Sequence, residues 1–167
     1  MQAVQNSTSN QQLSAAERTQ ITEFIHSSCA TLDREAFEDY LALFHPEARY
    51  EVVVYSPDIR KDMIWLAHDK CELTELLKMV PSHARQLGRY FRQSNVEQIQ
   101  KDEGSGLFSV TSSVVVIYTE IDGSSRLFAV ARYHDKVRIA SDQMPLLVKR
   151  VVQLETRDLG TGSHLPI

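Results

Sequence analysis

The sequence has little cysteine, glycine and tryptophan, and it has no long apolar run. Its 167 residues include two cysteines, six glycines and one tryptophan. Two cysteines are too few for a disulfide framework or a cysteine-rich metal site, so we expect Cys29 and Cys71 to be buried small hydrophobes in a reducing compartment. The longest apolar runs, such as VVVI at 114–117, fall far short of the roughly 20 residues that cross a bilayer. The sequence therefore predicts no membrane span.

The chain also lacks a strong charge of either sign. Its 18 Lys and Arg residues stand against 22 Asp and Glu residues, which gives a net charge of -4. This charge is too small and too mixed to predict binding to nucleic acid or to an anionic membrane surface. The first residues, MQAVQNSTSNQQ, lack the basic start and apolar stretch of a secretory signal, so we expect a cytoplasmic protein.

Composition divides the chain into three segments. Residues 1–13 are rich in Gln, Ser and Asn and have little to bury, so they predict a disordered arm that could order against a partner. Residues 14–156 carry the apolar periodicity of a single domain. Residues 157–167, RDLGTGSHLPI, have no core pattern of their own, and a docking arm and a disordered tail are equally consistent with them.

Two helices are predicted near the start of the domain. Ser14 and Glu17 have the spacing of a capping box. Asp33 is expected to cap a second helix that ends near His45, because Pro46 disfavours helical geometry in the residue before it. The apolar positions on one face of the first helix are Ile21, Phe24, Ile25, Cys29 and Leu32.

The remainder of the domain is mostly typical of strands. The run RYEVVVY at 49–55 is aromatic and β-branched. A third helix is expected at about 69–79, with Asp69 as its cap and His68 in the loop before it. Helices followed by a strand meander predict an α+β domain, in which N-terminal helices pack on one face of a strongly curved, mixed or antiparallel sheet. The long strands, separated by turn-forming residues, are expected at about 89–101, 107–120, 126–139 and 146–156.

Four consecutive apolar residues, Val114 to Ile117, interrupt the alternation of the second long strand. Neighbouring residues of a strand point to opposite faces, so apolar side chains must lie on both sides of the sheet here. One face can be covered by the helices. The other predicts a protein interface ahead of the wall of a ligand cavity.

The stretch ARYHDKVRI places His134 beside Asp135. Adjacent strand residues face opposite sides, so the two side chains are not expected to form a catalytic pair. One is predicted to face the core or a partner, and the other to pair with a basic residue of a neighbouring strand. A catalytic role would require a third group across the sheet.

Basic residues recur at even positions of the same strand. Arg126, Arg132 and Arg138 share parity, so they are predicted to emerge on one face, with Lys149 and Arg150 on the next strand. An ion-pair network is the first interpretation of this pattern, and an anion pocket is the alternative.

Motifs for metal, nucleotide or covalent chemistry are lacking. No two histidines have His-x-x-x-His spacing, and neither Cys-x-x-Cys, a Gly-rich phosphate loop nor a Gly-x-Ser-x-Gly elbow occurs. The sequence therefore predicts no catalytic, cofactor-binding or metal-ligating residue in this chain. The six histidines are His26, His45, His68, His83, His134 and His164.

The order of several short motifs resembles one family, the small or beta subunits of Rieske non-haem iron ring-hydroxylating oxygenases. The resemblance runs from about Thr22 to Thr156, and it implies the cone-shaped fold of nuclear transport factor 2. The motifs that carry it are Leu32-Asp33, Tyr40 to Phe44 (YLALF), Arg49-Tyr50, Ser94-Asn95-Val96 and Arg150 to Leu154 (RVVQL).

The resemblance implies a non-catalytic structural subunit of a terminal oxygenase component, a dioxygenase or monooxygenase of aromatic compound catabolism. It implies three large (alpha) and three small subunits in a hetero-hexamer around a three-fold axis. A Rieske 2Fe–2S cluster and a mononuclear iron would be held by the large subunit. Glu51 and the run GRYFRQ at 88–93 stand where many family members have Trp and an Arg-x-Arg-His run, which leaves room for a more polar substrate such as an aromatic acid or a sulfonate.

Two other functions share this fold class. The chain could be an independent isomerase or dehydratase that uses the interior of the cone, or a ligand-binding or dimerising module without catalysis. An enzyme would need an ionisable group with a perturbed pKa deep inside the cone. The candidates for such a group are Asp39, Tyr50, His134 and Asp135.

Overall fold

The computed structural model describes residues 13–82, 87–102, 104–140, 144–159 and 165–167. The arm predicted at residues 1–13 thus lies outside these residues except for Leu13, and so do His83 and His164. None of the helices in these ranges is long and apolar enough to cross a membrane. In chain order the elements are α1 (Ala15–Asp33), α2 (Phe37–Ala42), β1 (Phe44–Ser56), β2 (Lys61–Asp69), α3 (Lys70–Met79), a short 3-10 helix (Val80–Ser82), β3 (Arg89–Lys101), β4 (Leu107–Thr119), β5 (Ser125–Arg138) and β6 (Leu146–Leu154).

Helix α1 confirms the capping box, but the predicted cap of α2 is wrong. Ser14 and Glu17 cap α1 reciprocally, and the predicted apolar face is buried. Helix α2 begins at Phe37 without a side-chain cap. The Asp33 carboxylate instead accepts hydrogen bonds from the backbone N–H of Arg92, at 2.9 Å, and from its guanidinium, at 2.6 Å. The bond to the guanidinium joins two opposite charges, which a cap bond from backbone N–H groups does not, and this explains the choice of partner.

The boundary between α2 and β1 lies earlier than expected, and β2 was not expected at all. Helix α2 ends at Ala42, so His45 and Pro46 belong to β1. Pro46 is tolerated there because the pairing of β1 with β6 is irregular between Phe44 and Arg49. Strand β2 contains His68, so the loop predicted at this position is wrong. Residues 61–65 of β2 are all exposed, and a strand without a buried face shows no alternating pattern.

The six strands form one sheet in the order β2-β1-β6-β5-β4-β3. The four long strands β3 to β6 form the predicted antiparallel meander, and their bounds agree with the expected ranges to within two residues. Strand β1 pairs parallel with β6 and antiparallel with β2, so the sheet is mixed.

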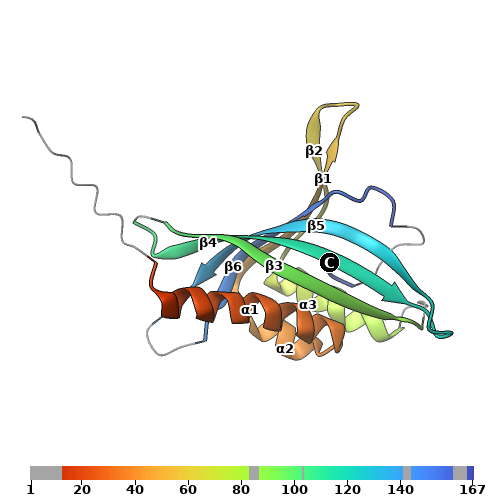
Figure 1. The fold of residues 1–167 in the computed structure, drawn as a ribbon, viewed down its shortest axis with the longest axis horizontal. Helices are drawn as coiled ribbons and strands as arrows, with labels where there is room; N and C mark the ends of the chain where they lie inside the picture. Colours follow the sequence, from red (N-terminus) through yellow and green to blue (C-terminus); the bar gives the residue numbers. More distant parts are fainter. Residues whose placement is uncertain (1–12, 83–86, 103, 141–143, 160–164) are drawn as a thin grey trace, which may run out of the picture.

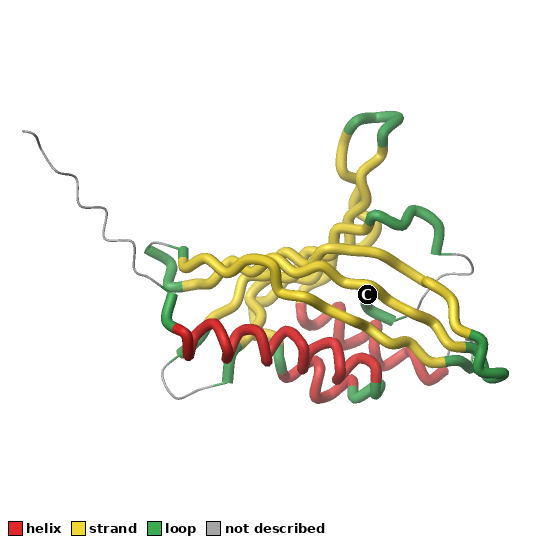
Figure 2. The backbone as a smooth tube through the Cα atoms, in the orientation of Figure 1, coloured by secondary structure: helices red, strands yellow, loops and turns green. Residues whose placement is uncertain are grey.

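The sheet is curved, and the helices cover one of its faces (Figure 1). The tube view shows the same two layers, with the β1–β2 hairpin projecting beyond the helix-covered part (Figure 2). In the 114–117 run, Val114 and Val116 are buried, whereas Val115 is 37% exposed and Ile117 is half-buried. Apolar side chains therefore lie on both faces of β4, as predicted.

A bulge in β5 overturns the prediction that three arginines share a face. The register pairs Arg132 with Ser113 and Arg126 with Tyr118, and it shifts between Val116 and Ile117. Tyr118 is buried on the helix side of the sheet, so Arg126 lies on that side, with its guanidinium over the Tyr118 ring. An extra residue reverses the facing of every position beyond it, which parity alone does not reveal.

The two cysteines differ in burial. Cys29 is buried in the core, as predicted, but Cys71 is exposed, so its predicted burial is wrong. Cys71 lies in the first turn of α3, whose buried positions are Leu73 and Leu77. At 100° per residue, position 71 points away from both leucines, so helical geometry accounts for the exposure.

Replacing Gly88 by alanine is expected to lower the free energy of unfolding by about 1 to 3 kcal/mol. The added Cβ would overlap the Tyr118 phenol and the backbone oxygen of Thr119. The Tyr118 hydroxyl is held there because it accepts a hydrogen bond from the Gly88 N–H at 2.9 Å. Urea denaturation measures the effect. Leu87→Ala, at the neighbouring position, whose side chain is 79% exposed, is the control, and equal losses in both variants would contradict the steric explanation.

Candidate functional site

A buried ion pair lies between the helices and the sheet. The Arg150 guanidinium donates two hydrogen bonds of 2.8 Å to the Asp135 carboxylate, and both side chains are 0% exposed. Ser28 accepts further bonds from Arg150, whose guanidinium lies 4.1 Å from the centre of the Tyr133 ring. Burial alone would lower the pKa of Arg150, but the Asp135 carboxylate raises it well above its ordinary value. Both side chains of the pair are therefore charged, and both carboxylate oxygens of Asp135 accept hydrogen bonds from Arg150.

Strand alternation explains why these two charges are inside. From residue 129 onward the buried positions of β5 are Ala129, Ala131, Tyr133, Asp135 and Val137, so Asp135 occupies a position of the apolar series. The register places it directly opposite Arg150 of β6. Two opposite charges on adjacent strands and on one face can therefore meet in the core.

His134 faces the other side of the sheet. It is exposed, and its Nε2 lies 3.1 Å from the amide oxygen of Gln153. The prediction that His134 and Asp135 face opposite sides of the sheet is confirmed. One residue was predicted to face the core or a partner, and the other to pair with a basic residue of a neighbouring strand. This assignment is wrong, because Asp135 both faces the core and pairs with Arg150.

A second buried pair joins α1 to β3. Arg92 is 5% exposed, and its Nη1 donates to Asp33 at 2.6 Å. Its Nη2 donates to the backbone oxygen of Pro166 at 2.6 Å. Both buried arginines therefore have a carboxylate partner, and the interior carries no net charge from these four groups.

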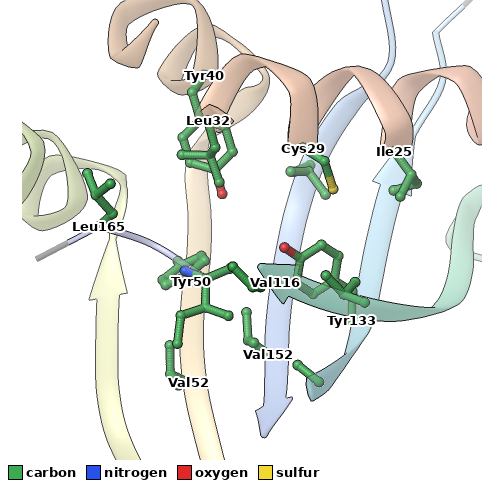
Figure 3. Close-up of a cluster of buried hydrophobic side chains, with 14 of the residues drawn as sticks. Ile25, Cys29, Leu32, Tyr40, Tyr50, Val52, Val116, Tyr133, Val152 and Leu165 are labelled. Carbon is green, nitrogen blue, oxygen red and sulfur yellow. Dashed lines mark hydrogen bonds between the residues drawn. The ribbon is translucent and has the colours of Figure 1, made fainter. Parts of the chain in front are cut away.

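Three tyrosines complete the polar interior. Figure 3 shows Tyr40, Tyr50 and Tyr133 in the layer between the helices and the sheet, with Tyr133 beside Cys29. Burial raises the pKa of all three phenols above the ordinary value, so they stay protonated at neutral pH. Among the described residues, five buried side-chain polar atoms have no hydrogen-bond partner. One is His68 Nδ1, and the other four are Tyr40 Oη, Tyr133 Oη, Ser112 Oγ and Arg92 Nε.

The opposite face of the sheet carries an apolar row. Phe91 of β3 is the register partner of Ile117 of β4, which is the partner of Leu127 of β5. Phe91 is 56% exposed and Leu127 is 59% exposed. We call these three residues the outer apolar row. Val115 extends it on β4.

Ion pairs lie on the same face of the sheet as the outer apolar row. Arg132 contacts Glu155 at 2.8 Å, and Lys149 contacts Glu51 at 3.0 Å. The ion-pair network predicted for the basic residues therefore exists at Arg132 and Lys149. Such exposed pairs contribute little to stability.

The sequence and the fold both resemble those of known proteins. No family model matches the sequence. The chain is 30% identical over 147 residues to the beta subunit of 2-aminobenzenesulfonate 2,3-dioxygenase from Alcaligenes sp., covering 88% of this chain and 97% of that protein. It is 31% identical over 151 residues to the beta subunit of the methanesulfonate monooxygenase hydroxylase from Methylosulfonomonas methylovora, covering 86% and 83%. The chain belongs to the beta-subunit family of Rieske non-haem iron oxygenases.

The fold agrees with this family. A chain in the structure of naphthalene 1,2-dioxygenase with bound indole aligns with this beta subunit at a TM-score of 0.75 and 19% identity, covering 89% of this chain and 83% of that chain. The resemblance inferred from short motifs and the predicted cone fold are both confirmed. The beta subunit is thus a subunit of an oxidoreductase.

The candidates for an independent active site are not brought together. Asp39, in the first turn of α2, is exposed, and so is His134. Tyr50 and Asp135 lie inside, but Asp135 is bound to Arg150 through both of its oxygens. A carboxylate held in this way is a poor general base, because proton uptake would break the ion pair.

Metal ligands do not converge in the part of the beta subunit that the structure describes. Within those residues no group of three or more His, Cys, Asp or Glu side chains is placed to hold an ion. His26 lies on α1, His45 on β1 and His134 on β5. The expectation that this chain holds no metal stays a prediction.

We call the two arginine–aspartate pairs and the three buried tyrosines the interior cluster. Sequence reasoning missed some of its residues. Arg92 and Tyr133 were not singled out as interior groups, and Arg150 was placed in an ion-pair network. One signal was present for Asp135, since apolar residues flank it at every second position from Ala131 to Val137. Arg92 gave no such signal, because the residues that share its face of β3, Tyr90, Ser94 and Val96, are only half-buried and do not form an apolar series.

Proposed function

We propose that this beta subunit is a non-catalytic, structural subunit of the terminal component of a multicomponent Rieske oxygenase. The observation that carries the proposal is the similarity along 97% of the 2-aminobenzenesulfonate dioxygenase beta subunit. The interior supports it, because the carboxylates Asp33 and Asp135 are neutralised by arginines and so are not available for acid–base chemistry.

The partner in this proposal is the large, or alpha, subunit, which would bind the Rieske 2Fe–2S cluster and the mononuclear iron. Three large and three small subunits would form a hetero-hexamer around a three-fold axis.

A closed ring requires two different surfaces on each chain. The outer apolar row and the projecting β1–β2 hairpin are two such surfaces. The hairpin exposes Tyr55, Ile59, Met63, Ile64 and Trp65.

The substrate class in this proposal is a small aromatic or sulfonated compound. The two curated relatives are subunits of enzymes named for 2-aminobenzenesulfonate and methanesulfonate. The replacement of the family's usual Trp by Glu51 also favours a polar substrate over a hydrocarbon. We also propose that the complex is cytoplasmic.

Purification of the beta subunit with its native partners tests this function. We expect it to elute with a larger protein that contains iron and acid-labile sulfide, at a mass consistent with three subunits of each kind. The beta subunit purified alone is expected to contain neither. A monomer that converts a small molecule unaided would contradict the proposal.

A further inference from the structure

Residues 165–167 pack inside the beta subunit, between the helices and the sheet. Leu165 is 6% exposed and Ile167 is 5% exposed, and both belong to the main hydrophobic core. Figure 3 shows Leu165 on the same side of the sheet as Tyr40 and Tyr50. We call Leu165, Pro166 and Ile167 the internal segment.

Side chains from two distant strands bind the backbone of the internal segment. The Tyr50 hydroxyl accepts a hydrogen bond from the Ile167 N–H at 3.0 Å and donates one to an Ile167 backbone oxygen at 3.1 Å. Arg92 donates to the Pro166 oxygen at 2.6 Å. Tyr50 is in β1 and Arg92 is in β3, and three strands separate β1 from β3 in the sheet. The internal segment therefore connects β1 with β3, which strand pairing does not.

Strand β3 depends on such contacts because it lies at the edge of the sheet and pairs only with β4. At its other edge, the backbone N–H of Arg92 donates to the Asp33 carboxylate of α1 at 2.9 Å. The Arg92 guanidinium is buried, and it binds both Asp33 and the Pro166 oxygen. Loss of the Pro166 oxygen would leave Arg92 Nη2 buried and unpaired, which disfavours the buried position of Arg92. The internal segment therefore stabilises the contact between β3 and α1.

Arg92 lies directly behind the outer apolar row. Phe91 precedes it in β3, and adjacent residues of a strand point to opposite faces of the sheet. Arg92 is buried on the helix side, whereas Phe91 is 56% exposed on the outer face. The other members of the row, Ile117 and Leu127, belong to β4 and β5. The alignment of the row across three strands therefore depends on where Arg92 holds β3.

We propose that the internal segment is a conformational latch: when it is bound to Tyr50 and Arg92, it holds β3 where the outer apolar row can bind the large subunit. This inference rests on the proposed function, which supplies the large subunit as the partner. A protein that binds its partner in only one of two states loses affinity in proportion to the population of that state. Release of the internal segment therefore weakens assembly, although no residue of the segment lies on the outer face.

Hydrogen exchange in the full beta subunit tests the effect of the latch on β3. Tyr50→Phe keeps the ring in the core and removes only the hydroxyl that binds Ile167. The exchange rate of the β3 amides, divided by that of the β5 amides, is expected to rise at least about fivefold in this variant. A uniform loss of stability would leave this ratio unchanged. Tyr133→Phe is the matched control, because its buried hydroxyl has no hydrogen-bond partner among the described residues, and it should not change the ratio.

Dissociation of the purified complex on dilution tests the effect of the latch on assembly. The complex that contains Tyr50→Phe is expected to dissociate at a concentration about tenfold higher than the unmodified complex, and the complex with Tyr133→Phe at an unchanged concentration. Leu165→Ser combined with Ile167→Ser removes the apolar anchors of the internal segment and should have a larger effect in the same direction. If this double variant does not fold, Tyr50→Phe decides the test alone.

The failure of the latch and the failure of the proposed function give different results. A Tyr50→Phe complex as stable as the unmodified one would overturn the latch, and so would an unchanged exchange ratio for β3. Neither result would affect the assignment of a large subunit as partner. An unmodified beta subunit that never elutes with a large iron–sulfur protein would contradict the proposed function, and with it the latch.

Discussion

Replacing Asp135 by asparagine is expected to lower the free energy of unfolding by about 3 to 5 kcal/mol, because it leaves the Arg150 charge buried without a counter-charge. Both side chains are 0% exposed, and Arg150 directs two hydrogen bonds at the carboxylate. Water cannot replace the lost partner at a site this deep, so the desolvation cost of the guanidinium remains. Urea denaturation at neutral pH, with circular dichroism as the signal, measures the loss.

Two further variants separate the buried pair from charge effects in general. Arg132→Ala removes the exposed pair with Glu155 and is expected to cost less than about 1 kcal/mol. Asp135→Leu combined with Arg150→Met removes both charges, and it is expected to be more stable than Asp135→Asn, since apolar substitutes often equal a buried ion pair. A loss for Asp135→Asn no larger than that for Arg132→Ala would show that the pair does not stabilise the core.

The sequence predicted the long strands and the first and third helices well because each has a buried face. Strands β3 to β6 lie where alternation and turn residues placed them. Strand β2 could not be found in this way, because it lies at the edge of the sheet and exposes residues 61–65. Its pairing with β1 is a tertiary contact, and such contacts override local propensity.

The interior site was less predictable than the fold. The bulge in β5 decides on which face of the sheet Arg126 lies. One extra residue moves all later side chains to the opposite face, and nothing in the sequence marks its position. Asp33 has the usual appearance of a cap, and only the arrival of Arg92 from β3, 59 positions away, shows its role. Partners that are distant in sequence form this cluster, so a local pattern pointed to Asp135 but not to Arg92, and it did not reveal which residues pair.

Placing glutamates in the outer apolar row is expected to release the beta subunit from its complex without unfolding it. Phe91 and Leu127 are 56% and 59% exposed on a face that the helices leave uncovered. Burying a carboxylate in an apolar interface without a partner is strongly unfavourable. The double variant Phe91→Glu and Leu127→Glu should therefore weaken association by at least about a hundredfold, which corresponds to about 1.4 kcal/mol for each site.

The mass of the purified complex and the stability of the isolated chain together decide this prediction. Surface changes of this kind usually alter the free energy of unfolding by about 0.5 kcal/mol or less, so the isolated variant should denature like the unmodified beta subunit. Ile121→Glu introduces the same charge outside the row, at a position 74% exposed, and should leave the complex intact. A double variant that still elutes with a large iron–sulfur protein at full mass would show that the row faces water in the assembly, because two unpartnered carboxylates cannot be accommodated at a packed apolar contact at so small a cost.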